Sequence, residues 1–276
     1  MANAPKPTTV TKESSSSASN LFAVLVIPLC IAIGAALFMF VLGDPANFID
    51  NNPDNHPVPG NFAGMAYKGG PIVAILIGML LMVFVFSVER FIVISKATGS
   101  GSLDAFIKKI QGYLASSNIE GAMTECDKQK GSVANVIKSG MKKYREMEVE
   151  PNMDTDQKCL AIQKDIEEAT TLEMPMLEQN LTVLATLVSV GTLTGLLGTV
   201  TGMIKAFSGL ATSGAPDQAA LANGISEALI CTATGISTST VAIIMYNILT
   251  SKIDKLTYAI DEAGFSIIQT YASTHK

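Results

Sequence analysis

Four runs of the sequence carry no charged residue and are long enough to cross a lipid bilayer. A hydrocarbon core ~30 Å thick is spanned by about 20 helical residues at ~1.5 Å per residue. Only 16% of the chain is charged, whereas soluble domains carry about 25% charged residues. The sequence therefore predicts an all-α polytopic membrane protein with four transmembrane helices. The runs contain 22, 18, 24 and 24 residues, and they are Leu21–Leu42, Pro71–Val88, Leu181–Ile204 and Ala228–Ser251.

The distribution of lysine and arginine predicts which connections lie in the cytoplasm. Twelve of the 19 basic residues fall between Arg90 and Lys164, whereas the 44–70 connection contains only Lys68 and the 211–222 connection contains none. Because basic connections stay in the cytoplasm, we expect residues 90–180 and both chain ends to lie inside. The first apolar run exceeds the ~7–15 residues of a signal peptide, so we expect an uncleaved anchor.

The connecting segments differ in composition. The N-terminal segment is rich in serine and predicts a disordered tail, while Pro, Asn and Gly in the 44–70 connection predict an irregular loop. The expected organisation is a cytoplasmic tail at 1–20, transmembrane helices at 21–43, 71–89, 181–210 and 223–251, a periplasmic loop at 44–70, a cytoplasmic helical domain at 90–180, a periplasmic turn at 211–222 and a cytoplasmic tail at 252–276.

Apolar residues of the cytoplasmic segment recur at the 3.6-residue period of a helix. This period gives two stretches with one apolar face each. A further stretch runs from Asp156 through Pro175 into the third apolar run and shows no break into strands. We therefore expect this stretch to form one long helix that Pro175 kinks without ending it. The residues of the first two faces are Leu103, Phe106, Ile107, Ile110 and Leu114, and then Val133, Val136, Ile137, Met141 and Tyr144.

The sequence offers no set of residues for bond-making chemistry. Its two histidines, His56 and His275, lie far apart, and there is no phosphate-binding loop of the Walker type. We therefore expect neither an enzyme nor a cofactor, metal or nucleic-acid site. The four cysteines have no paired spacing and are expected to be inert small residues, and they are Cys30, Cys126, Cys159 and Cys231.

Glycines in the third apolar run follow one another at spacings of four, three and four. Such a stripe lines one side of a helix and lets another helix backbone approach closely. Packing alone is one explanation, and a role beside a polar path is the other. The four glycines are Gly191, Gly195, Gly198 and Gly202.

Two threonines are predicted to lie at the same depth in the membrane. If the hairpin between the last two spans turns between Ala215 and Pro216, Thr199 and Thr232 are each 16 residues from the turn. Both hydroxyls would then lie ~14–16 Å below the outer edge, near the midplane of a ~30 Å core. Single threonines usually bond their own helix backbone, and that is our expectation for Thr201. Two at matched depth favour a polar path.

Charged residues are rare in these two spans. Lys205 and Glu227 lie 10 and 11 residues from the turn, so they are a candidate ion pair at the external mouth, unless Lys205 extends to the interface. Glu227 is the one carboxylate of the last two spans, and none of the four spans contains aspartate. Hydroxyls can pass or coordinate a proton but cannot store one, so a proton path would need Glu227 or a carboxylate from another chain.

The last two spans carry a recognisable pair of segments. "GLLGTVTGMIKAF" and "GISEALICTATG" resemble the signatures of the ExbB/TolQ/MotA proton-channel family, and most closely its ExbB and TolQ branch. "LEQNLTVLATL", "IEGAMTECDKQKGSVANVIKSGMKKY" and "FSVERF" are similar to that branch too, and the resemblance extends over residues 71–260. The additional first span departs from the three spans usual in ExbB and TolQ.

The resemblance implies a partner-dependent motor in the bacterial inner membrane. Five copies of the channel subunit would surround two single-span partners of the ExbD or TolR type, each with a membrane aspartate. The proton motive force would drive work on TonB or TolA. By this resemblance the family's pore threonines fall on Thr199 and Thr232, and its glutamate falls on Glu227.

We therefore expect an ExbB-type proton-channel subunit that energises TonB-dependent outer-membrane transport. The alternatives are a stator of a TolQ-, gliding- or flagellar-type motor, and a non-conducting membrane scaffold held together by its glycine face.

Overall fold

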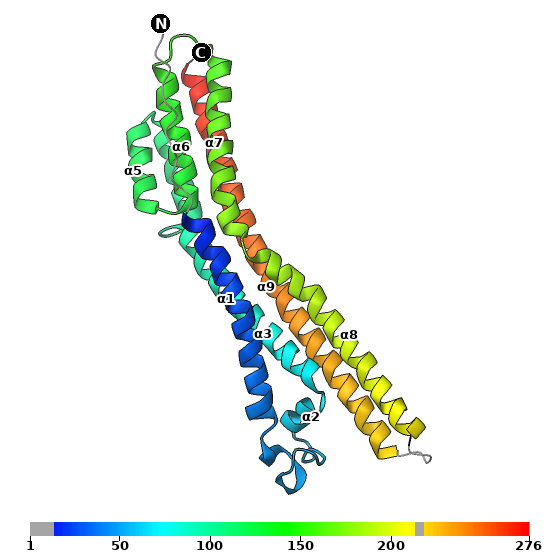
Figure 1. Cartoon of the computed structure of the whole chain (residues 1–276). Coiled ribbons are helices and arrows are strands. Elements are labelled where there is room, and N and C mark those ends of the chain that lie inside the picture. The colour runs from blue at the N-terminus through cyan, green and yellow to red at the C-terminus, as the bar shows by residue number, and fades with distance from the viewer. Residues whose placement is uncertain (1–13, 213–217, 276) are drawn as a thin grey trace. The chain divides into compact units, whose positions relative to one another are not determined.

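The computed structural model describes residues 14–212 and 218–275, and these residues form helices with no β-strand (Figure 1). Side chains are described for 21–208, 221–222 and 224–275. The first 13 residues of the expected tail and residues 213–217 of the expected turn lie outside the described part. The α-helices are α1 (Ser14–Leu37), α2 (Phe62–Lys68), α3 (Pro71–Thr98), α4 (Leu103–Ala115), α5 (Ile119–Gln129), α6 (Ser132–Glu148), α7 (Thr155–Glu178), α8 (Leu181–Thr212) and α9 (Gln218–Thr274).

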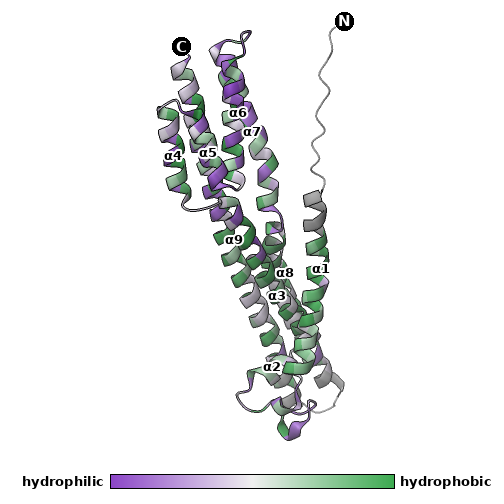
Figure 2. Ribbon diagram, turned by 90° about the vertical axis from the view of Figure 1, so that its left-hand side faces the viewer, coloured by the Kyte–Doolittle hydropathy of each residue, from purple (hydrophilic) through white to green (hydrophobic). Residues whose placement is uncertain are grey.

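Four of the described helices are long and apolar enough to cross a membrane, as the sequence predicts. Figure 2 shows hydrophobic residues along α1 and polar residues gathered on α6 and α7. The all-α, four-span prediction is confirmed. The apolar stretches lie within Leu21–Leu42, Pro71–Ala115, Leu181–Ser208 and Gly224–Thr274.

Several helices extend beyond their expected limits. Helix α1 begins at Ser14, inside the segment expected to be a disordered tail, and a π-helical turn η1 (Phe38–Leu42) follows it. Helix α9 continues for 57 residues to Thr274, so residues 252–274 are helical rather than a separate tail. Residues 90–98 likewise continue α3 past its expected end.

The prediction of one uninterrupted helix across Pro175 is wrong. Helix α7 contains Pro175 and ends at Glu178. Gln179 is extended, and Asn180 adopts the left-handed conformation with φ 63° before α8 begins. Asparagine enters this region more readily than most residues because its short polar side chain bonds locally. The break therefore lies at Gln179–Asn180, after Pro175, where the sequence predicts a kink.

The described residues divide into two compact units, 14–82 with 191–238 and 83–190 with 239–275. The second unit packs α4, α6 and α7 against the C-terminal half of α9, and α5 packs against α4 and α6. Both predicted apolar faces are buried in it, apart from Leu103, which is partly exposed. Tyr271 of α9 donates a hydrogen bond to the carbonyl of Met147 over 2.9 Å and packs edge-on against Tyr144.

The first unit contains a folded segment where the sequence predicts an irregular loop. Two 3-10 turns, η2 (Pro45–Asn47) and η3 (Ile49–Asn51), precede α2, and Phe48 between them is only 2% exposed. Tyr67 lies edge-on to the Phe48 ring and stacks on Phe38. We call residues 44–70 the cap.

Glycines permit close helix contacts in the same unit. A Cβ placed on Gly34 of α1 would lie 2.7 Å from the Cα of Gly78 in α3. Along α8, the stripe of Gly191, Gly195, Gly198 and Gly202 is buried and faces α9 of the same chain.

At Gly235 the backbones of α8 and α9 approach each other directly. A Cβ on Gly235 would lie 2.7 Å from the Gly191 carbonyl oxygen and 2.8 Å from the Gly195 Cα. Both are backbone atoms, so no side-chain rotation can relieve the overlap. At Gly198, a Cβ would lie 2.3 Å from the Cβ of Cys231. The glycine stripe therefore lets two helix backbones touch.

Gly235→Ala is expected to destabilise the protein by about 1–3 kcal/mol, because the added methyl group forces the two backbones apart. The measurement is the free energy of unfolding in detergent, by denaturant titration. Gly264→Ala, in the same helix, is the matched control, because its Cβ would meet only Ile166 at 3.4 Å, an ordinary contact. Equal stability of the two variants would contradict the close approach.

A second prediction concerns the ion pairs of Glu125 in the second unit. Lys109 donates to Glu125 over 2.6 Å, and this hydrogen bond, with Lys128 3.4 Å away, holds the pKa of the Glu125 carboxyl below its ordinary value. A carboxyl group with a lowered folded-state pKa stabilises the fold above its unfolded pKa and loses that effect as pH falls through the folded pKa. Glu125→Gln should therefore lower the melting temperature at neutral pH and match wild type in acid.

The control for Glu125 is Glu120, on the same helix α5. Its ion pair with Arg145 is largely exposed, so Glu120→Gln should change the melting temperature little at either pH. A Glu125→Gln effect that is the same in acid as at neutral pH would refute the ionic contribution.

Candidate functional site

Thr199 of α8 and Thr232 of α9 are hydrogen-bonded to each other through their hydroxyl groups. Both side chains are half-buried in the contact between the two helices. Each hydroxyl also lies within hydrogen-bonding distance of the Gly195 carbonyl oxygen, 3.2 Å from Thr199 and 3.3 Å from Thr232. The two residues that the depth calculation pairs therefore meet around one backbone carbonyl.

The glycine contact makes this meeting geometrically feasible. The Cβ of a residue at Gly195 would lie 3.1 Å from the Cα of Gly235 and 3.4 Å from the Cα of Thr232. A larger side chain at Gly195 would push the α9 backbone away from α8 and so separate the two hydroxyl groups. The glycine stripe and the hydroxyl pair are therefore parts of one arrangement.

The hydroxyl pair can relay a hydrogen bond but cannot store a proton. Each threonine hydroxyl has one hydrogen to donate and two lone pairs to accept with. When one hydroxyl donates to the other, the second can donate to the carbonyl of Gly195, or of Ala228 when it is Thr232. Rotation of both hydroxyls reverses the direction of the chain, which is the motion a relay requires.

Thr201 lies outside this pair. Its hydroxyl bonds the carbonyl oxygens of Leu197 and Gly198 in its own helix, at 3.0 and 3.1 Å. This is the usual arrangement for a threonine in an apolar helix.

An open apolar hollow of about 550 Å³ adjoins Thr199 on α8. Ile204 and Phe207, which line it, are 62% and 57% exposed in the single chain. Thr199 is the one hydroxyl-bearing residue of its lining, so Thr199 borders both the α8–α9 contact and the outer surface of α8. The lining residues are Leu196, Thr199, Val200, Met203, Ile204 and Phe207.

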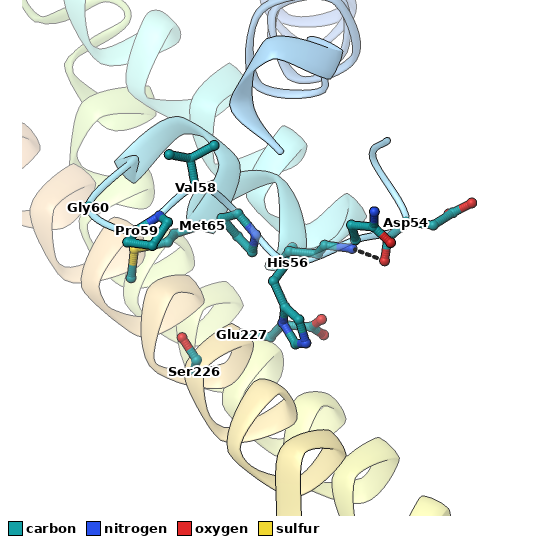
Figure 3. Close-up of a pocket in the computed structure, with 11 residues that line it drawn as sticks. Asp54, His56, Val58, Pro59, Gly60, Met65, Ser226 and Glu227 are labelled. Atoms are coloured by element: carbon teal, nitrogen blue, oxygen red, sulfur yellow. Dashed lines mark hydrogen bonds between the residues drawn. The ribbon is translucent and has the colours of Figure 1, made fainter. Parts of the chain in front are cut away.

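Glu227 is half-buried and lines a cavity of about 390 Å³ beside the cap (Figure 3). Lys205 is exposed, and it forms no ion pair with Glu227 among the contacts of the described side chains. Lys205 and Lys68 act on the carboxylate through longer-range electrostatics. Glu227, Lys205 and Lys68 therefore lie near one another, but neither lysine forms an ion pair with Glu227 among the described side chains.

Sequence reasoning assigned no role to His56 or Lys68, which share this cavity with Glu227. The cavity lies between the cap, which precedes α3, and the start of α9. No local sequence pattern predicts a contact between segments so far apart in the chain. Arg90 of "FSVERF" was also missed. It is 2% exposed, pairs with Glu89 and donates to the Met176 carbonyl over 3.0 Å, near the end of α7.

Comparison with known proteins gives a consistent family. Residues 128–262 match the model of the MotA/TolQ/ExbB proton channel family. The Tol-Pal system protein TolQ of Pseudomonas aeruginosa is 33% identical over 156 residues, which cover 56% of this chain and 67% of that protein.

Relatives named ExbB match shorter stretches. The biopolymer transport protein ExbB of Salmonella typhimurium is 39% identical over 70 residues, which cover 25% of this chain and 29% of that protein. The putative biopolymer transport protein ExbB-like 3 of Synechocystis is 34% identical over 88 residues, covering 31% of this chain and 42% of that protein.

The matched region contains Thr199, Thr232 and Glu227, and the described helices supply the membrane spans that a channel needs. The chain is a multi-pass membrane protein that belongs to the MotA/TolQ/ExbB proton channel family.

Proposed function

We propose that this chain is the proton-channel subunit of an inner-membrane motor in which Thr199 and Thr232 line the proton path. The observation that carries the proposal is the hydrogen bond between these two hydroxyl groups at the α8–α9 contact. Hydroxyls that are already linked can hand a proton along without large movements of the helices. Membership of a proton channel family supports this use of the pair.

The proton path also needs a group that can hold a proton. The four predicted spans contain no aspartate, and Glu227 lies five residues from Thr232, about 7.5 Å along the helix. We assign the missing acid to a single-span partner of the ExbD or TolR type. The apolar hollow beside Thr199 offers a surface where such a partner helix can bring its aspartate to the hydroxyl pair.

The ring expected for this family is a homopentamer around two partner helices, with both chain ends in the cytoplasm. Exposed apolar residues on α8, such as Leu193, Leu196 and Ile204, are consistent with burial against other helices or lipid. The load that we propose is a TonB-like protein acting in outer-membrane transport. A TolA-like load is the second candidate, and the longer match to TolQ favours it.

A non-conducting scaffold is the remaining alternative. The glycine stripe would serve a scaffold equally well, because it accounts for packing alone. The threonines separate the two ideas, since a scaffold has no use for their hydroxyl groups.

Thr199→Val and Thr232→Val are expected to lower the proton flux through the assembled complex at least about tenfold, because ~1.4 kcal/mol lost at one hydrogen bond is a factor of ten. Valine keeps the shape of threonine and removes the hydroxyl. The measurement uses the complex purified from its own membranes and reconstituted in vesicles with an internal pH-sensitive dye.

Thr201→Val is the matched control, because Thr201 bonds only its own helix. It should conduct like wild type, and all three variants should assemble normally by native mass spectrometry. Wild-type flux in both Thr199→Val and Thr232→Val would leave the scaffold as the better account.

The partner and the load are tested by crosslinking in intact cells followed by purification of the tagged chain. We expect a single-span protein with a membrane aspartate and a TonB-like protein, with five copies of this chain in the native mass. Recovery of a TolA-like protein in place of the TonB-like one would assign the chain to the second candidate. Absence of any single-span partner would contradict the assignment of the acid.

A further inference from the structure

The cap holds His56 in a defined position. The backbone N–H of Ile49 donates to the His56 carbonyl over 3.0 Å, and the Asn55 side chain donates to the Ile49 carbonyl over 3.1 Å. An isolated β-bridge joins Phe48 to Pro57 on the other side of His56. Since Phe48 is buried at the centre of the cap, the backbone on both sides of His56 is fixed to a packed core.

Lys68 holds the same segment from α2. Its ammonium group donates to the carbonyl oxygens of Pro53 and Asp54 over 2.8 and 3.2 Å, and it lies 5.6 Å from the centre of the Phe48 ring. This clamp fixes the approach to His56 and places one positive charge on the cavity wall.

The base of the cap contacts α9 one turn from Glu227. The Cys231 thiol donates to the Gly69 carbonyl over 3.2 Å, and a Cβ on Gly69 would lie 3.5 Å from the Ile230 side chain. The cavity therefore has the cap on one side and Ser226 and Glu227 of α9 on the other (Figure 3).

Some of the charged and titratable side chains that line the cavity are exposed, and others are half-buried. His56 and Asp54 are exposed, whereas Lys68 and Glu227 are half-buried. These four, with Lys205 acting on Glu227 from α8, are the charged and titratable groups that face this space. A volume of about 390 Å³ has room for several water molecules, each of which takes ~30 Å³ in the liquid.

We propose that the cap and α9 form the external proton-uptake vestibule of the channel, in which His56 collects protons and passes them to Glu227. This inference rests on the proposed function. A hydronium ion of the external solution donates a proton to the neutral imidazole of His56 and becomes water. The imidazolium gives it through water to the Glu227 carboxylate, which leaves a neutral imidazole and a carboxylic acid ready to release the proton toward Thr232. Histidine suits the first step because a ring nitrogen of neutral imidazole can accept a proton and then pass it on.

His56→Gln tests the vestibule when the variant complex is reconstituted and compared with the wild-type complex. Glutamine keeps a polar side chain of similar reach but cannot titrate. We expect the proton flux to fall about tenfold at an external pH of about 7 and to approach wild type at about pH 5, because a positioned acid–base group and a charged cleft each raise proton capture by factors of ~10 or more. Imidazole added outside the vesicles should restore the flux.

His275→Gln is the matched control, because His275 is the other histidine of the chain and belongs to the second unit. It should conduct like wild type. A His56→Gln flux equal to wild type at both pH values, or a loss that imidazole does not restore, would overturn the vestibule. If Thr232→Val abolishes the flux while His56→Gln does not change it, the proposed function stands and the vestibule alone fails.

Discussion

Direct contact between the backbones of α8 and α9 is the constraint on which the candidate path depends. At Gly235 and Gly195 no Cβ separates the helices, and a methyl group added at Gly235 would lie within 2.8 Å of backbone atoms of α8. In a membrane, such contacts replace the hydrophobic effect as the source of helix association, because lipid chains are as apolar as leucine. The same contact brings Thr199 and Thr232 within reach of each other.

The hydroxyl pair is stable in an apolar setting because its donors are satisfied. The carbonyl oxygens of Gly195 and Ala228 accept from it, so neither hydroxyl is left without a partner. Satisfaction by neutral groups has a chemical consequence. A threonine hydroxyl has no accessible charged form. The pair can therefore pass a proton along its hydrogen bonds, but a carboxylate elsewhere must hold the proton.

The sequence allowed the hydroxyl pair to be predicted because both helices have the same rise per residue. Equal distance from an assumed turn at Ala215 and Pro216 was enough to match Thr199 with Thr232. The spacing of the glycines predicted a face for close packing against another helix, and the structure shows that this helix is α9. These features depend on local periodicity and on one hairpin. The arithmetic treats the helices as rigid rods, and within the first unit that treatment is adequate.

Features that depend on tertiary contacts or on one residue's conformation were not predicted. The break between α7 and α8 is caused by left-handed Asn180, in a stretch whose apolar pattern continues without interruption. The cap was expected to be irregular because its composition is that of turns. Its order comes from Phe48 and Tyr67, which are brought together by folding and leave no periodic trace in the sequence.

The family match begins at residue 128, so α1 and the cap lie outside it. They are nevertheless joined to the helices that carry the hydroxyl pair. Gly34 fixes α1 against Gly78 of α3, and Gly69 at the base of the cap contacts Ile230 and Cys231 of α9. Cys231 also packs against Gly198, next to Thr199. A series of contacts therefore runs within one unit from the cap through Cys231 of α9 to the glycine stripe of α8, so the cap is physically joined to the helices that carry the hydroxyl pair.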